Sequence, residues 1–184
     1  MSTATIDISR IGFSSEVFEQ FLATRIEPSW ITGARREAFE TYQNLLHEDL
    51  DPEEFKRVDL RVFNAGKFRP SSDDVDLSAI DTLLSDKTEF GGAISHVNGQ
   101  CTQSNVSDEI RAQGVLFGEL KTLLTSHREL LEPYFMKQAV RPDADRFSAW
   151  HAAFWTGGTL LYVPRNVEVA LPLHSLIAHS RNGV

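Results

Sequence analysis

The sequence has little cysteine and no long hydrophobic run. Cys101 is the one cysteine among 184 residues, so no internal disulfide can form. No apolar stretch approaches the roughly 20 residues that a membrane-spanning helix needs. Residues 1–10 lack a basic region followed by an apolar core, so we expect no secretory signal there. Together these absences predict a protein of the reducing cytoplasm, with no membrane association.

Positive charge is also scarce. The chain has 18 Lys and Arg against 26 Asp and Glu, which gives a net charge of −8. A surface of that sign repels phosphate backbones and anionic lipid headgroups. We therefore expect no nucleic-acid partner and no membrane partner.

Sequence signatures of catalysis are missing as well. There is no glycine-rich phosphate loop, no Gly-x-Ser-x-Gly elbow, no paired-cysteine zinc motif and no His-Glu-x-x-His. We assign no catalytic, cofactor-binding or metal-binding residue, and we predict that the chain is not an enzyme.

The chain is nevertheless rich in core-forming residues. Hydrophobic residues make up 41% of it, including 12 Phe and 3 Trp, which is enough for a packed domain. Helical patterns dominate as far as Gly158, and strand patterns follow. We expect an α+β protein with a mainly helical domain over 1–158 and a strand-rich region over 159–184.

Apolar spacing in the first half predicts helices over 15–25 and 28–47, the second beginning with Pro28. Alternation from Val58 to Val62 predicts a short strand, and a helix is expected over 77–84.

A hairpin is predicted around Asn98-Gly99. This pair is preferred in two-residue type I′ turns, because both positions need a positive φ. The turn would place His96 opposite Cys101 on one face, with Cβ atoms about 5 Å apart.

In the second half we expect a short strand after Gly114 and helices near 120–124 and 130–135, with Ser126 as the cap between them. A further helix should start at Pro142 and end at Gly157-Gly158. Strands are then expected over 159–163 and, in alternation, from Val167 almost to the end. An open sheet edge there would make the isolated chain prone to self-association.

Cys101 with His96 is the sharpest chemical candidate. An imidazole across from a thiol could lower the pKa of the thiol and make it a nucleophile, a persulfide or sulfur carrier, or a soft-metal ligand. The plain alternative is a half-buried cysteine beside a structural histidine, and the absence of a third, orienting group favours it.

The other candidates are weaker. His174 and His179 are five residues apart, so on a strand they point to opposite faces. The acidic pairs Asp73-Asp74 and Asp108-Glu109 are expected to be solvated surface. The aromatic residues Phe147, Trp150, Phe154 and Trp155 are expected to form core rather than a base-stacking platform.

Several blocks, taken in order, resemble the N-terminal half of the SufB/SufD family of iron–sulfur cluster assembly proteins. The most specific runs from Ala152 through Trp155-Thr156-Gly157-Gly158 into Tyr162-Val163-Pro164-Arg165-Asn166. Earlier blocks are Glu27-Pro28-Ser29-Trp30, Arg35 to Phe39, Phe55 to Arg61, and Gly114 to Phe117. The Asp59-Leu60-Arg61 segment favours the SufD type, although Phe55, Val58 and His151 depart from the usual residues.

The resemblance implies a fold and a role. Family members continue from a helical domain into a right-handed parallel β-helix, so 159–184 would be its first strands and the chain a truncated portion. The implied function is that of a non-catalytic scaffold subunit in a SufBCD-type complex. Its partners would be a SufB-like sister subunit and a SufC-like ABC-type ATPase. The transient cluster, and the residues that build it, would lie outside this chain, and Cys101 does not match the family's functional cysteine. A pure protein-binding module remains the other alternative.

Overall fold

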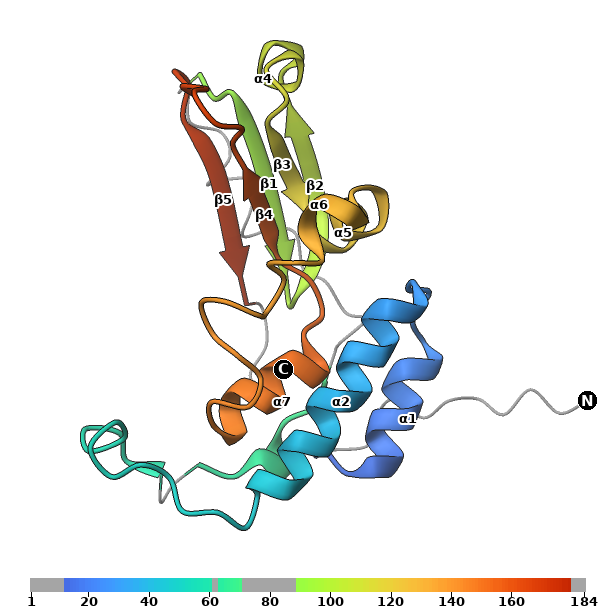
Figure 1. Cartoon of the computed structure of the whole chain (residues 1–184), viewed down its shortest axis with the longest axis vertical. Helices are drawn as coiled ribbons and strands as arrows, with labels where there is room; N and C mark the ends of the chain where they lie inside the picture. The colour runs from blue at the N-terminus through green and yellow to red at the C-terminus, as the bar shows by residue number, and fades with distance from the viewer. Residues whose placement is uncertain (1–11, 61–62, 71–88, 180–184) are drawn as a thin grey trace, which may run out of the picture. The chain divides into compact units, whose positions relative to one another are not determined.

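The computed structural model describes residues 12–60, 63–70 and 89–179 (Figure 1). Helices and small sheets alternate along the chain, so the predicted α+β class is confirmed. The described chain divides into two compact units. Unit 1 contains residues up to Pro70 together with Pro133–Trp155. The described part of unit 2 consists of residues 89–132 and 156–179. The helix expected over 77–84 and the pair Asp73-Asp74 lie outside the described residues.

Unit 1 is built on three helices, α1 (Ser15–Ala23), α2 (Ser29–Leu45) and α7 (Arg146–Phe154), with a short 3₁₀ turn, η2 (Ala65–Lys67). The two predicted N-terminal helices are thus confirmed. The Ser14 side chain accepts a hydrogen bond from the Val17 N–H and so starts α1. Pro28 is the N-cap of α2 rather than its first residue.

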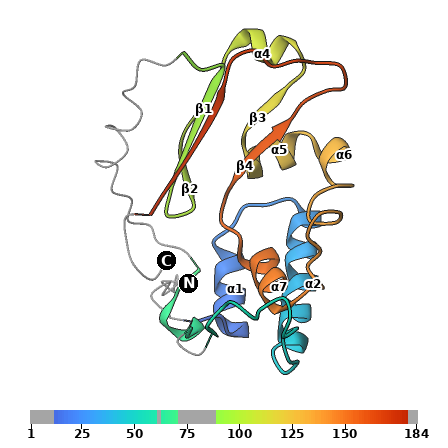
Figure 2. The same cartoon turned by 90° about the vertical axis from the view of Figure 1, so that its left-hand side faces the viewer.

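Aromatic rings fill the core of unit 1. Phe18 stacks on Phe39 with centroids 4.1 Å apart, and Phe154 meets Phe18 edge-on at 5.4 Å. The helix α7 therefore packs against the α1–α2 pair, as Figure 1 and Figure 2 both show. The buried cluster comprises Phe18, Phe21, Leu22, Ala38, Phe39, Tyr42, Ala149, Ala152, Ala153 and Phe154.

Unit 2 contains two small sheets. One has the order β2-β1-β5, from β1 (Gly92–Val97), β2 (Gln100–Val106) and β5 (Leu173–Ala178). The other pairs β3 (Leu116–Glu119) with β4 (Thr159–Tyr162) in antiparallel fashion. β1 is antiparallel to β2 but parallel to β5. Three short helices accompany the sheets: α4 (Asp108–Ala112), α5 (Leu120–Ser126) and α6 (Arg128–Leu131).

The β1–β2 hairpin forms at the predicted turn. Asn98 has φ 50° and Gly99 has φ 80°, as a type I′ turn requires. The register pairs His96 with Cys101, as expected, and a bulge follows between Ser95 and His96.

The two sheets of unit 2 pack on each other (Figure 2). The Phe117 ring lies so close to Gly92 that a Cβ there would be 2.9 Å from it. The Thr159 and Ser175 hydroxyls share a 2.6 Å hydrogen bond between the sheets. β1 is the central strand of the three-stranded sheet, and the second sheet covers it. Its Ile94 and Val97 are almost fully buried.

Three expectations for the middle of the chain were wrong. Val58 and Leu60 form no strand: turns and a bend occupy residues 52–57, Val58 follows without regular structure and is exposed, and Leu60 is 3₁₀-helical. α6 ends at Leu131, so Tyr134 and Phe135 lie in turns. Ser126 is the last residue of α5 and not the cap of α6, a position taken by His127.

Boundaries near α7 and β5 also differ. α7 starts at Arg146, because the Asp145 carboxylate accepts hydrogen bonds from the Phe147 and Ser148 N–H groups. It ends at Phe154, since Trp155 has an extended ψ of 139°, so Gly157-Gly158 do not cap it. The last strand begins only at Leu173, and the alternation from Val167 forms no strand before it.

Candidate functional site

Cys101 and His96 face each other across the hairpin but differ in environment. His96 is 2% exposed, and neither ring nitrogen makes a hydrogen bond of normal geometry. Cys101 is a free, exposed thiol whose Sγ contacts the Gln103 carbonyl oxygen at 3.5 Å. The predicted pairing of His96 with Cys101 is confirmed, and the chemical activity of the pair depends on the protonation state of each side chain.

The electrostatics oppose an activated thiol. Desolvation, and then the charge of Glu119, raise the pKa of Cys101. Burial lowers the pKa of His96, and only weaker effects of Glu119 and the Gly158 carbonyl act the other way. Both shifts favour the neutral thiol and the neutral imidazole, which is the opposite of a thiolate–imidazolium pair.

The remaining polar candidates are dispersed. The His174 ring stacks on Phe90 with centroids 4.9 Å apart. Asp108 and Glu109 occupy the exposed first turn of α4, where Asp108 pairs with Arg111 at 3.4 Å. Within the ranges that the structure describes, no three His, Cys, Asp or Glu side chains gather as a metal site.

Of the four aromatic residues expected to form core, two are buried and two are partly buried. Phe154 and Trp155 are buried, and Trp150 and Phe147 pack at the edge of the same unit. The base-stacking alternative has no support, because each of these rings packs on another ring of unit 1: Phe147 on Trp150, Phe154 on Phe18, and Trp155 on Phe135.

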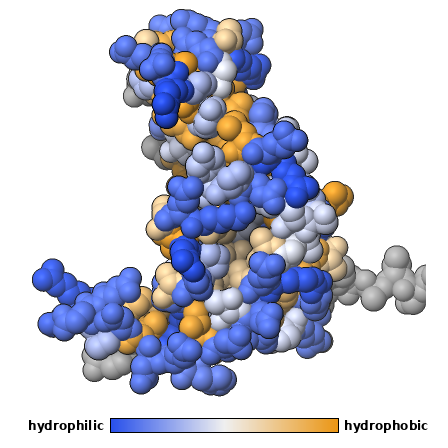
Figure 3. Space-filling model, in the orientation of Figure 1, coloured by the Kyte–Doolittle hydropathy of each residue, from blue (hydrophilic) through white to orange (hydrophobic). Residues whose placement is uncertain are grey.

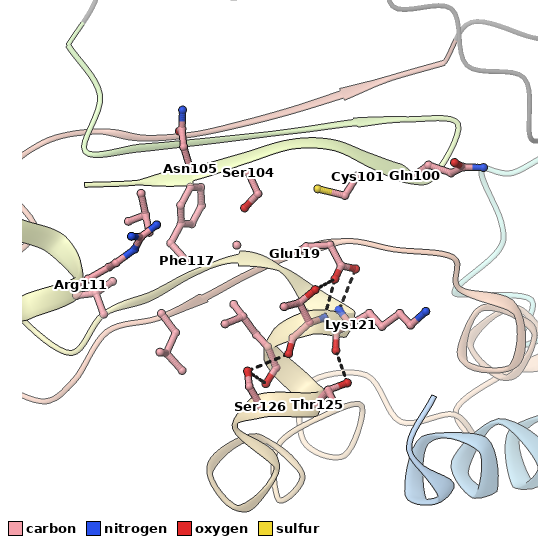
Figure 4. Close-up of a pocket in the computed structure, with 16 residues that line it drawn as sticks. Gln100, Cys101, Ser104, Asn105, Arg111, Phe117, Glu119, Lys121, Thr125 and Ser126 are labelled. Carbon is pink, nitrogen blue, oxygen red and sulfur yellow. Dashed lines mark hydrogen bonds between the residues drawn. The ribbon is translucent and has the colours of Figure 1, made fainter. Parts of the chain in front are cut away.

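Unit 2 has a groove between β2 and the β3–α5 segment (Figure 4). Its volume is about 1,030 Å³. β2 provides one wall with uncharged side chains, most of them polar, and Phe117 and Leu123 contribute apolar surface opposite. Cys101 lines this groove, whereas His96 does not.

Three charged residues border the groove. Arg111 lies toward one end and Lys121 toward the other (Figure 4). The Glu119 carboxylate between them accepts hydrogen bonds from the Lys121 N–H at 3.0 Å and the Thr122 N–H at 2.6 Å, which caps α5. Glu119 is therefore engaged with the positive end of that helix.

Unit 1 holds a buried ionic cluster that the sequence reasoning missed. Arg35 is 1% exposed and its Nη1 donates to the Ala153 carbonyl at 2.9 Å. Its Nε and Nη2 bind the two carboxylate oxygens of Glu27, and Arg25 contacts the same carboxylate at 3.5 Å. The guanidinium also lies 4.0 Å from the Trp155 ring centroid. This cluster fixes the chain before α2 to the end of α7.

Elsewhere the surface is mixed. Figure 3 shows one face covered mainly by hydrophilic residues, with separate hydrophobic patches among them. Among the described helices, none is long and apolar enough to span a membrane.

Comparison with known proteins decides the family. The model of the SufBD protein N-terminal region matches residues 15–174 of the chain. The chain belongs to the SufBD family. The resemblance inferred from the sequence blocks is thereby confirmed, and the SufBD match covers both units described above.

SufBD relatives with curated names agree. The iron–sulfur cluster assembly protein SufD of Bacillus subtilis is 28% identical over 181 residues, covering 95% of this chain and 40% of the relative. SufB of the same organism is 23% identical over 177 residues, covering 91% of this chain and 38% of the relative. A SufBD family protein of Mycobacterium bovis, Mb1496, is 28% identical and is covered over 21% of its length. The chain thus spans about two fifths or less of these relatives.

Proposed function

We propose that this chain serves iron–sulfur cluster assembly as the N-terminal part of a SufD-like scaffold subunit. The observation that carries the proposal is the SufBD match over residues 15–174. The identity to a SufD is higher than that to the SufB of the same organism, 28% against 23%, which supports the SufD type.

In this proposal the chain itself does no chemistry. The raised pKa of the Cys101 thiol and the lowered pKa of His96 count against a thiol enzyme or sulfur carrier. The transient cluster would be assembled on parts of the full-length protein other than this chain, as the resemblance implies. The proposed location is the cytoplasm, where a lone exposed thiol stays reduced.

The β5 strand supports a continuation into a parallel β-helix. It pairs with β1 in parallel, and its other edge has no strand partner within the described residues. A parallel coil stacked on that edge would extend the sheet and cover it. We propose that the region predicted over 159–184, which the structure describes as far as residue 179, begins such a β-helix.

The partners proposed are a SufB-like sister subunit and a SufC-like ABC-type ATPase, bound mainly through later parts of the full-length protein. The test uses the full-length protein in its native host, carrying an affinity tag. The tagged protein should co-purify with a second SufBD-family subunit and an ABC-type ATPase. Depletion should lower the specific activity of [4Fe–4S]-dependent enzymes while cluster-independent enzymes keep theirs. Normal cluster-enzyme activity after complete depletion under iron limitation would overturn the proposal.

A further inference from the structure

The groove of unit 2 runs beside an open strand edge. β2 stands at one side of the β2-β1-β5 sheet, so within the described residues it has a strand partner on one side only. Six of its seven residues are exposed, while its partner β1 is almost entirely buried. β2 therefore offers backbone N–H and C=O groups for further pairing.

The edge of β2 has little protection against pairing with another strand. Exposed edge strands are usually guarded by charged side chains, by proline or by bulges. Gln100–Val106 contains no charged residue and no proline, and its one such feature is the bulge near the turn. An edge that is guarded only by this bulge, beside a groove, suits the addition of an extended peptide as a new strand.

Charge defines what kind of peptide would fit. Arg111 and Lys121 lie toward opposite ends of the groove (Figure 4), in a chain whose net charge is −8. Arg111 also pairs with Asp108 at 3.4 Å, and because both side chains are exposed, a peptide carboxylate would share or replace that contact. The carboxylate of Glu119, between them, is already bound by N–H groups of α5. Across from β2, Phe117 and Leu123 contribute apolar surface to the lining of the groove.

We propose that this groove binds an extended peptide segment, acidic at both ends and apolar between them, which adds as a strand to β2. β2 is preferred to β3 as the template because it has seven residues against four. At roughly 3.3 Å per residue, a seven-residue peptide matches the length of β2. Its two terminal carboxylates would then lie toward opposite ends of the groove, as Arg111 and Lys121 do (Figure 4). The proposal concerns a binding surface and does not depend on the assembly role.

The probe is a fluorescein-labelled peptide of sequence DVTVTVE, titrated with the purified chain and followed by anisotropy. Saturable binding is expected that weakens with salt, and the matched peptide KVTVTVK should bind more weakly. The variant Arg111→Gln/Lys121→Gln should weaken binding of DVTVTVE by about two- to tenfold, because it removes two exposed ion pairs with the peptide. It should leave binding of the neutral peptide QVTVTVQ unchanged.

Strand addition is tested on the peptide, so that folding of a variant is not in question. Two peptides carry N-methyl groups at alternate residues, one on each backbone edge. Methylation of the edge that pairs with β2 should lower affinity by more than about tenfold, and methylation of the other edge should not. Equal effects of the two methylations, binding of the lysine peptide as tight as that of the acidic one, or no saturable binding would each overturn the proposal.

Discussion

Arg35 and Glu27 form a two-pronged ion pair inside unit 1: the Arg35 Nε and Nη2 atoms lie 2.8 and 3.0 Å from the two carboxylate oxygens. Both side chains are 1% exposed. Because this pair bridges the chain before α2 to the Ala153 carbonyl at the end of α7, it orders elements far apart in sequence.

Replacing Arg35 with leucine should therefore destabilise unit 1 strongly. The change leaves the Glu27 carboxylate buried, with only Arg25 nearby at 3.5 Å. Breaking one side of a buried pair costs about 3–5 kcal/mol, so we expect a loss near 3 kcal/mol in urea unfolding. Arg36→Leu, on the exposed face of the same helix, is the control and should barely move the midpoint. Equal midpoints for the two variants would refute the role given to Arg35.

Replacing each of two glycines with alanine should change the stability in opposite directions, at Gly99 in the hairpin turn and at Gly33 in α2. Gly99→Ala introduces a Cβ at φ 80° and 2.1 Å from the Thr156 Oγ1, so a destabilisation of about 1–3 kcal/mol is expected. Gly33→Ala, inside α2 with no atom within 4 Å of the new Cβ, should stabilise by roughly 0.5–1 kcal/mol. Thermal melts of both variants check the pair, and a stabilising Gly99→Ala would contradict the turn geometry.

His96 makes stability depend on pH. Burial lowers its pKa in the folded state, so the unfolded chain binds a proton more readily. Its contribution is present above the unfolded pKa of about 6.5 and is lost as pH falls below it. The melting temperature of the chain should drop between about pH 7 and pH 5, and His96→Gln should flatten part of that drop. His151, whose pKa burial also lowers, accounts for a further part. An unchanged slope in His96→Gln would show that His96 does not contribute.

The Cys101 thiol should behave as a poor nucleophile. Its pKa is raised by desolvation and by Glu119, so alkylation by iodoacetamide should show a pH midpoint above the ordinary value of about 8.5. Cys101→Ser provides the unreactive control. A midpoint below 7.5 would revive the thiol-enzyme hypothesis.

Self-association should run through β5. Ile177 is 61% exposed on a strand whose second edge has no described strand partner. Ile177→Lys should shift the isolated chain toward the monomer in sedimentation experiments at rising concentration. Ile26→Lys changes an even more exposed residue, 92%, in unit 1 and should have no such effect. A wild-type chain that is monomeric throughout would contradict the open-edge expectation.

Local signals were readable from the sequence, and distant ones were not. Asn98-Gly99 specifies its turn through backbone preferences of two adjacent residues, so the hairpin and the His96–Cys101 register could be predicted. The burial of Arg35 depends on Ala153, 118 positions away, and no periodicity reports such a contact. The groove was missed for the same reason, because its walls come from β2, β3 and α5.

The parallel pairing of β1 with β5 has a consequence for synthesis on the ribosome. Gly92 pairs with Leu173, so the central strand of its sheet must wait for a partner made much later. At about 5–20 residues per second, translation leaves β1 without that partner for roughly 4–16 s. During this interval its apolar residues Ile94 and Val97 lack one of their neighbours. Nascent chains that stall in this window are the ones most exposed to chaperone capture or aggregation.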